Sequence, residues 1–370
     1  MTRILIYVSV GVALALTALL FTVGGDEPPA PTIVPDETGQ ALAPTEPPAP
    51  PEGARRLTFA TDWRAQAEQG GFYQALARGY YAERGLGVTI RQGGPGSNVP
   101  QLMAAKAIDF GLGSNSFIAL NMADAGLPAR AVMASFQKDP QVLIAHPDQG
   151  VNDIVDMADR PIFLADASIG AFWVWLKARY GFTDAQVRKY TFNNAPFLAN
   201  PQSIQQGYIT SEPFTIEREA GFKPKVFLLA DYGYPSYGAM ILAHNDMIAE
   251  EPQVVQDFVD ASIEGWLSYL QSDPSAGDAL IMGANPEMTE ERLAEARNAI
   301  IENGIVESGD ALEGGVGVMT HSRWAKFFAT MASNGVYERT LPLEEAYTLQ
   351  FVGGGPSESG DDDPASKETE

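Results

Sequence analysis

The stretch TDWRAQAEQGGFYQALARGYYAERGLGVTIRQGGPGSN, residues 61–98, decides the fold of this chain. It predicts the end of a strand, a polar loop, a helix, a second strand and a glycine-rich loop over residues 93–98. Successive parallel strands end at one edge of a sheet, and open α/β sheets bind ligands at that edge. Gly70 and Gly71, which open the helix, lack Cβ atoms and would let backbone N–H groups come close to a ligand.

Strand and helix patterns alternate along most of the chain, which predicts α/β lobes with parallel sheets and right-handed crossovers. The chain has 370 residues, enough for two lobes. We expect lobe one to span residues 57–145 and 238–352, and lobe two residues 146–237. The predicted strands are 57–60, 88–91, 108–111, 131–135, 142–145, 162–165, 190–192, 208–209, 226–229 and 240–243.

Helices are predicted between these strands and over most of the C-terminal third. The segment 252–271 carries apolar residues at helical spacing. Thr289 and Thr320 are expected N-caps of two later helices, whose aromatic residues should belong to the core. The other predicted helices are 71–84, 99–106, 116–124, 151–157, 171–179, 201–206 and 215–219.

Composition excludes several classes of function. The net charge is −23, and without a basic stripe to neutralise phosphates we expect no nucleic acid partner. The chain has no cysteine, which excludes disulfides, thiolate catalysis and a lipid anchor on cysteine. Its three histidines, at positions 146, 244 and 321, have no metal-binding spacing. We expect neither a metal nor a cofactor.

The two ends of the chain are expected to lie outside the globular part. Residues 4–23 form an uncharged apolar run after Arg3, long enough to cross a membrane. We therefore expect residues 1–23 to be an uncleaved signal anchor, the alternative being a cleaved signal peptide. Residues 24–56 are predicted to be a disordered linker rich in proline and acidic residues, and residues 353–370 an acidic disordered tail. Either N-terminal reading places the protein outside the cytoplasm, and the anchor would tether it to the inner membrane.

The opening stretch carries a family resemblance. Asp62-Trp63, a polar loop, Gly70-Gly71-Phe72-Tyr73, a helix ending at Gly85-Leu86 and a strand over 88–90 resemble the periplasmic solute-binding proteins related to thiamine-pyrimidine synthase. The resemblance covers residues 57–352. It implies a two-lobed periplasmic-binding-protein fold of type II with a ligand cleft between the lobes. It also implies a small-molecule solute, such as a pyrimidine thiamine precursor, a riboflavin-like molecule or a sulfonate, and an ABC permease and ATPase as partners.

Candidate ligand-binding residues follow the predicted strands. A flat heteroaromatic solute needs stacking faces and a few oriented hydrogen-bonding groups in a cleft that closes. The candidates from lobe one are Trp63, Gln69, Tyr73, Gly94, Ser114 and Asn115, and those from lobe two are Ser168, Trp173, Asn194, Glu212 and Tyr232.

Glu212 is the most informative candidate, because it lies between a strand and a proline. A carboxylate there can accept hydrogen bonds from the N–H edge of an aminopyrimidine, and it repels nitrate or a sulfonate. The alternative readings are a surface ion pair for Glu212, a core position for Trp63, and simple helix capping for Ser114 and Asn115.

Two other functions compete with solute binding. The resemblance includes thiamine-pyrimidine synthases, which use iron, pyridoxal phosphate and a donor histidine in the first loop. Gln69 occupies the position of that histidine, and the cysteine-rich motif of those enzymes is missing around residues 136–139. We therefore expect a binding protein and no enzyme. A membrane-anchored sensor domain is the third reading.

Overall fold

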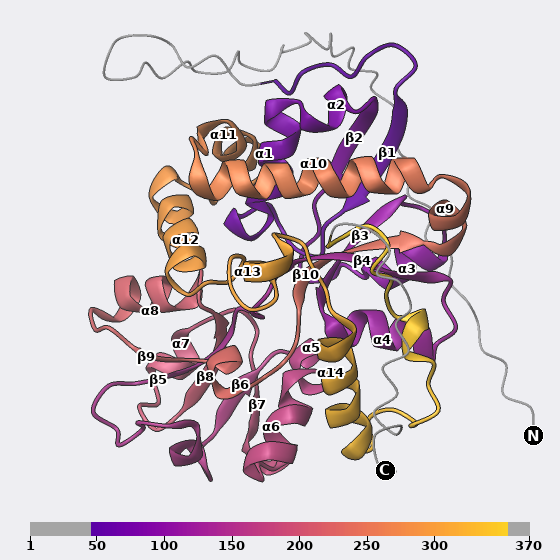
Figure 1. The fold of residues 1–370 in the computed structure, drawn as a ribbon. Helices are drawn as coiled ribbons and strands as arrows, with labels where there is room; N and C mark the ends of the chain where they lie inside the picture. Colours follow the sequence, from indigo (N-terminus) through magenta and orange to yellow (C-terminus); the bar gives the residue numbers. More distant parts are fainter. Residues whose placement is uncertain (1–45, 354–370) are drawn as a thin grey trace, which may run out of the picture. The chain divides into compact units, whose positions relative to one another are not determined.

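The first of two sheets contains the predicted opening strands. The computed structural model describes residues 46–353, whose arrangement Figure 1 shows. The first sheet has the strand order β2-β1-β3-β10-β4. β1 runs parallel to β2 and β3, whereas β10 runs antiparallel to β3 and β4. The bounds are β1 Arg55–Ala60, β2 Leu86–Arg91, β3 Phe110–Asn115, β4 Ala129–Phe136 and β10 Gly238–His244.

The second sheet has the order β7-β6-β8-β5-β9. β6 runs parallel to β7 and β8, and β5 runs antiparallel to β8 and β9. The bounds are β5 Gln141–Ala145, β6 Ile162–Leu164, β7 Val187–Lys189, β8 Ile204–Tyr208 and β9 Lys225–Leu228.

Each sheet owes its antiparallel strand to a direct passage of the chain between the sheets. The chain passes from β4 in the first sheet directly to β5 in the second sheet, with no helix between them. A strand entered in this way starts at the edge where its neighbours end, so Gly238 pairs with Asn115, and Gln141 with Tyr208. The α/β prediction is confirmed. Wholly parallel sheets were wrong, because a parallel neighbour requires a crossover connection.

Helices flank both sheets, and we use lobe one and lobe two for the elements around the first and second sheet. Lobe one has α1 Gly70–Arg78, α2 Tyr80–Glu83, α3 Val99–Ala104, α4 Ser116–Asp124, α9 Asn245–Glu250, α10 Pro252–Gln271, α11 Ser275–Ala284, α12 Glu290–Glu302, α13 Ala311–Gly314 and α14 His321–Ser333. Lobe two has α5 Asp166–Ile169, α6 Phe172–Tyr180, α7 Ala195–Leu198 and α8 Glu212–Ala220.

The long helix α10 lies across the first sheet and against α1 (Figure 1). Small residues allow this close packing, since a Cβ atom on Gly70 would lie 2.1 Å from the Tyr269 ring, and one on Gly71 would lie 2.3 Å from the Trp266 ring. The prediction that these two glycines bring the backbone to a ligand was therefore wrong. They make room for α10, which fixes α1 and the loop before it.

Several predicted elements are confirmed and three are corrected. The side chains of Thr289 and Thr320 accept hydrogen bonds from backbone N–H groups and cap α12 and α14 as predicted. The helix predicted over 71–84 is interrupted at Gly79, whose φ is 83°. The helix predicted over 201–206 is a turn followed by the start of strand β8, whose buried glutamine side chains do not follow an apolar strand pattern. The strand predicted over 190–192 lies at Val187–Lys189.

The predicted membrane segment, residues 4–23, lies outside the described residues, as do residues 24–45 of the linker and 354–370 of the tail. Within residues 46–353, no helix combines the length and the apolar character that a membrane crossing requires.

Candidate functional site

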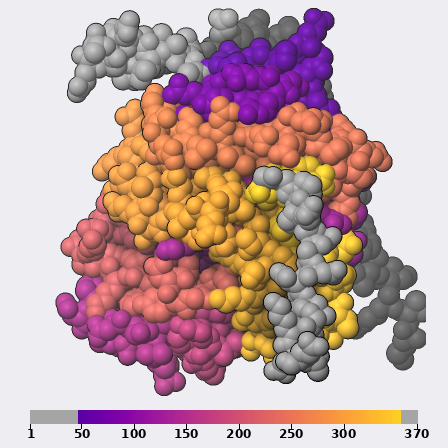
Figure 2. Space-filling model, in the orientation of Figure 1, coloured from indigo at the N-terminus to yellow at the C-terminus, as the bar shows by residue number. Residues whose placement is uncertain are grey.

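Three contacts join the two lobes, two of them between loops that follow strands and one between helices. The Thr210 hydroxyl, after β8, donates a hydrogen bond to Glu68 in the loop after β1. The Trp63 ring, in the same loop, lies 5.0 Å between centroids from the Phe192 ring after β7. Arg218 of α8 donates to Glu295 of α12 at 2.7 Å. The residues of α12 and α8 also meet at the surface in Figure 2. The ends of the two sheets therefore face each other, as the resemblance implies.

Three carboxylates lie at this junction. Asp62 accepts a hydrogen bond from the Ser114 hydroxyl. Glu212 accepts one from the Tyr190 hydroxyl at 3.2 Å and one from the backbone N–H of Tyr208 at 2.8 Å. Glu68 is 5% exposed, and its Oε2 atom has no hydrogen-bond partner within residues 46–353.

Burial raises the pKa of all three carboxyl groups. Mutual repulsion adds to this effect, because the charge of Asp62 raises the pKa of Glu68, and the charge of Glu68 raises that of Glu212. Burial also raises the pKa of Tyr208 well above its usual value, and Asp139 and the same three carboxylates raise it further. The site therefore has a strongly negative local field.

The aromatic pair of Trp63 and Phe192 stands beside these carboxylates. Trp63 is half-buried, and Phe192 is 50% exposed. Phe192 adopts a left-handed backbone with φ 59°, which is uncommon for a residue with a bulky side chain. Its ring also contacts Tyr190 at 5.2 Å between centroids. Each lobe thus presents one aromatic ring to the other.

A small cavity lies between the lobes beside Glu68. It measures about 50 Å³ and is lined by Glu68, Thr210 and Ser211, together with α8 and α12. A cavity of that size admits a water molecule but no ring. A ring-sized solute would enter only after the contacts between the lobes part.

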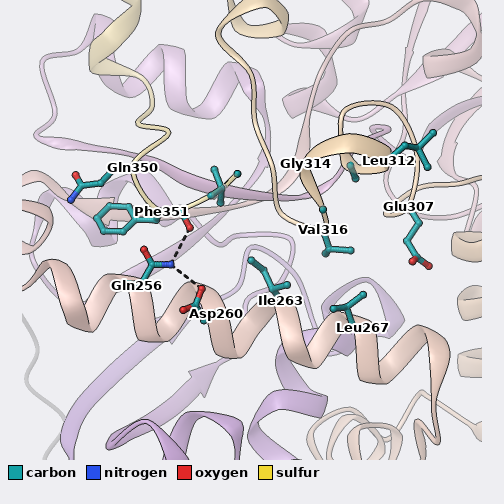
Figure 3. A pocket seen from close by; sticks show the side chains of 14 residues that line it. Gln256, Asp260, Ile263, Leu267, Glu307, Leu312, Gly314, Val316, Gln350 and Phe351 are labelled. Atoms are coloured by element: carbon teal, nitrogen blue, oxygen red, sulfur yellow. Dashed lines mark hydrogen bonds between the residues drawn. The ribbon is translucent and has the colours of Figure 1, made fainter. Parts of the chain in front are cut away.

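A wider cavity, about 720 Å³, lies elsewhere on lobe one. In Figure 3, Ile263 and Leu267 of α10 point toward Val316, while Gln256 bonds to Asp260 and to the backbone of Phe351. Its lining residues come from lobe one alone. We therefore place the candidate site at the junction of the lobes, where residues of both can act on one ligand.

The two chain crossings between the lobes are held by Arg323 of α14. Its guanidinium donates to the backbone oxygens of Pro235 at 3.0 Å and Ser236 at 3.1 Å, and also to that of Gln137. Gln137 belongs to the first crossing, after β4, while Pro235 and Ser236 belong to the second, before β10. One side chain of lobe one thus fastens both segments about which the lobes would move.

Asp139 in the first crossing is 1% exposed, and burial raises its pKa to about 7, against the backbone N–H of Gln141 and the charge of Arg323, which lower it. Its pKa in the unfolded chain is about 4. The folded protein therefore binds this proton more tightly, and the free energy of unfolding should fall as the pH rises from about 4 to about 7.

We expect Asp139→Asn to remove this dependence and to raise the free energy of unfolding at pH 8 by about 2 kcal/mol. Urea unfolding at pH 5 and pH 8 measures the effect, with Asp148→Asn, an exposed position, as the control. If the two substitutions changed the free energy of unfolding at pH 8 by the same amount, the raised pKa of Asp139 would be contradicted.

The structure brings some of the predicted site residues together. Trp63, Ser114 and Glu212 lie at the junction through the contacts given above. Asn115 follows Ser114, and its side chain accepts a hydrogen bond from the backbone of Phe117. The capping reading of Asn115 is therefore confirmed, and a role in binding stays a prediction.

The other predicted residues of lobe one have structural contacts. Tyr73 is 4% exposed, and burial raises its pKa to about 12. Gln69 is buried and bonds to the backbone N–H of Gln66 at 3.1 Å. A Cβ atom on Gly94 would meet nothing, whereas one on Gly93 would lie 2.4 Å from the backbone oxygen of Thr61. Tyr73 and Gln69 offer no open face, and the glycine that the fold requires is Gly93.

The predicted residues of lobe two, apart from Glu212, form no hydrogen bond with the three carboxylates within residues 46–353. Trp173 is 0% exposed and donates its indole N–H to Asp184, so it offers no open face here, and its contact with a solute stays a prediction. Asn194 is buried and bonds to Glu219 and Gln205. Tyr232 packs on Phe227.

Ser168 completes the set from lobe two. It is 6% exposed in the short helix α5, which follows β6. No side-chain hydrogen bond within residues 46–353 joins it to the three carboxylates. A contact of Ser168 with a solute stays a prediction.

Sequence reasoning missed five residues of the junction, namely Asp62, Glu68, Tyr190, Phe192 and Tyr208. Asp62 was visible as the partner of Trp63 in the family motif. The others lie in segments that the sequence assigned to a polar loop or to strands. Their importance depends on contacts between lobes, which no local pattern encodes.

Comparison with known proteins agrees with this geometry. The family model described as NMT1/THI5 like matches residues 66–276. The chain belongs to the NMT1/THI5-like family. The matched region begins in the loop after β1 and ends in α11, so it includes Glu68, Glu212 and both crossings but not Asp62.

One curated relative of this NMT1/THI5-like protein covers nearly its whole length. The riboflavin-binding protein RibY of Chloroflexus aurantiacus is 26% identical over 333 residues, which are 87% of this chain and 93% of RibY.

Solved structures show the same fold at low identity. The aliphatic sulphonate binding protein SsuA of Escherichia coli has a TM-score of 0.62 at 12% identity, covering 80% of this chain and 98% of SsuA. The putative SsuA of Methylobacillus flagellatus has a TM-score of 0.58 at 13% identity, covering 81% and 93%. The desulfurization enzyme DszB has a TM-score of 0.51 at 13% identity, covering 80% and 97%. The fold is that of periplasmic solute-binding proteins of ABC importers, and it also occurs in an enzyme.

Proposed function

We propose that this protein binds a small solute with a flat ring outside the cytoplasm and delivers it to an ABC permease and ATPase. The observation that carries the proposal is the Trp63–Phe192 pair, in which each lobe supplies one ring at a centroid distance of 5.0 Å. Its family and its similarity to a riboflavin-binding protein support the same conclusion.

The pair suits a solute that closes the two lobes. A ligand shifts a conformational equilibrium only by its difference in affinity for the two forms. A ring inserted between Trp63 and Phe192 would contact both lobes at once and replace one aromatic contact with two. Arg323, which fastens both crossings, lets the lobes part while the chain segments between them stay in place.

The carboxylates define the polar edge of the proposed solute. Asp62, Glu68 and Glu212 are hydrogen-bond acceptors when ionised, and N–H groups of a pyrimidine or flavin ring are donors. A sulfonate or nitrate would bring a further negative charge beside three carboxyl groups that already repel one another. We therefore assign the solute to ring compounds with N–H donors, in spite of the structural likeness to sulfonate-binding proteins.

The full chain should be tested against riboflavin, an aminopyrimidine, an alkanesulfonate and nitrate by isothermal titration calorimetry. A ring compound should bind, and Phe192→Ala should weaken that binding at least tenfold, since a lost aromatic stack and its buried area cost about 1.4 kcal/mol or more. Phe222→Ala, which truncates an aromatic ring of lobe two that packs on His146, is the control and should leave affinity unchanged.

Tight binding of the alkanesulfonate or nitrate alone would refute the assignment to ring solutes. Equal effects of the Phe192 and Phe222 substitutions on affinity would show that the ring binds away from the junction. Turnover of a ring compound would instead support the enzymatic reading, which the fold of DszB exemplifies.

A further inference from the structure

Glu68 holds a buried acceptor atom that nothing in the described chain satisfies. Its Oε1 accepts the hydroxyl hydrogen of Thr210, whereas Oε2 has no partner within residues 46–353. The residue is 5% exposed, so bulk solvent has little access to this atom. An unpaired buried acceptor is costly, and more so when it carries charge. Glu68 also lines the cavity between the lobes, where a group of a bound solute could reach it.

The negative charge around Glu68 is not balanced by a basic side chain. Asp62 and Glu212 both contribute to the same field, as their effects on neighbouring pKa values show. No lysine or arginine within residues 46–353 forms an ion pair with any of the three carboxylates. The junction therefore lacks the counter-charge that buried carboxylates ordinarily have.

Two arginines line the cavity but are engaged elsewhere. Arg218 donates to both carboxylate oxygens of Glu295, at 2.9 Å and 2.7 Å. Arg292 donates to the backbone oxygen of Glu287 at 3.0 Å. Neither guanidinium is directed to Glu68. Within residues 46–353 neither arginine of the cavity compensates Glu68, which leaves this role open to a cationic group of the solute.

We propose that Glu68, with Asp62 and Glu212, is the subsite for a cationic nitrogen group on the ring solute, such as an amidinium or a protonated amine. This inference rests on the proposed function and names the charge of its ligand. A cationic N–H group would donate to Glu68 Oε2 and offset the three carboxylates together. Trp63 and Phe192 would hold the attached ring, and an aromatic face also favours a nearby cation.

Three ring compounds of nearly equal shape test the charge preference. Benzamidine is a cation, benzamide is neutral and benzoate is an anion at pH 7.5. Calorimetric titration of the full chain should give at least tenfold tighter binding of benzamidine than of benzamide, and weaker binding still of benzoate. Glu68→Gln should weaken the binding of benzamidine at least tenfold and the binding of benzamide less than threefold. The substitution removes the charge of the side chain but keeps a hydrogen-bond acceptor.

Matched variants separate this role from a structural one. Glu217→Gln, an exposed position on α8, removes the same charge in lobe two and should leave both affinities unchanged. Glu212→Gln is the second test within the subsite and should also narrow the difference between benzamidine and benzamide. Thermal unfolding identifies a variant that fails to fold, in which case the other variant decides.

The outcomes distinguish this inference from the proposed function. Equal or tighter binding of benzamide or benzoate, with Phe192→Ala still weakening binding, overturns the cationic subsite alone. The cationic subsite is also overturned if the protein prefers benzamidine and this preference is unchanged in both Glu68→Gln and Glu212→Gln. Absence of binding by every ring compound, riboflavin included, overturns the proposed function as well.

Discussion

Gly265→Ala is expected to lower the free energy of unfolding by about 3 kcal/mol, because it overpacks the contact between α10 and α1. A Cβ atom at this position would lie 2.1 Å from the backbone oxygen of Gly71 and 2.6 Å from the Cβ atom of Ala75. The first neighbour is backbone and cannot rotate away, so one helix must move. Urea unfolding of the full chain measures the loss.

Gly283→Ala is the matched control for this substitution. Gly283 is an exposed residue of α11, and a Cβ atom there would meet nothing within 4 Å. Alanine should therefore raise stability slightly, by up to about 0.5–1 kcal/mol, since it restricts the unfolded chain and favours helix. A loss in both variants, or in neither, would contradict the tight packing of α10 on α1.

Arg323→Gln should also lower the free energy of unfolding by about 3 kcal/mol. The substitution removes the donors that reach the backbone oxygens of Gln137, Pro235 and Ser236, and buried acceptors left unpaired cost about 1–3 kcal/mol each. It also removes a charge that lowers the pKa of Asp139. Without that charge the pKa of Asp139 rises further. The pH range over which deprotonation of Asp139 lowers the free energy of unfolding should therefore extend to higher pH.

Lys326→Gln provides the comparison, because it removes one positive charge from an exposed position on the same helix. We expect the free energy of unfolding of this variant to lie within about 0.5 kcal/mol of that of the unchanged protein. If Arg323→Gln costs no more than Lys326→Gln, then the arginine does not fasten the crossings. Solute affinity measured on both variants would then show whether the crossings also affect closure of the lobes.

The sequence was sufficient to predict the positions of most strands along the chain and the residues that directly follow them. Trp63, Ser114 and Glu212 were found because strand ends can be recognised from local apolar patterns. Glycines were harder to interpret, since a missing Cβ atom looks the same whether a ligand or another helix fills the space. Gly70 and Gly71 face the rings of α10, which no pattern near them could indicate.

The rest of the site depends on long-range contacts. Glu68 is recognisable only through its bond to Thr210, and Phe192 only through its contact with Trp63. Both contacts join residues more than a hundred positions apart and on different sheets. Trp173 shows the ambiguity of a local pattern. A large aromatic residue that follows a strand is suited to a cleft and equally suited to the core, where Trp173 lies.

The position of β10 within the first sheet has a consequence for how the chain folds during synthesis. β10 lies between β3 and β4, yet it is made after all five strands of the second sheet. Until the ribosome has passed His244, β4 has no neighbouring strand in its sheet, while residues 141–228 already contain every strand of the other sheet. The second sheet can therefore form first, and β3 and β4 keep open hydrogen-bonding edges, which favour aggregation, until β10 is made.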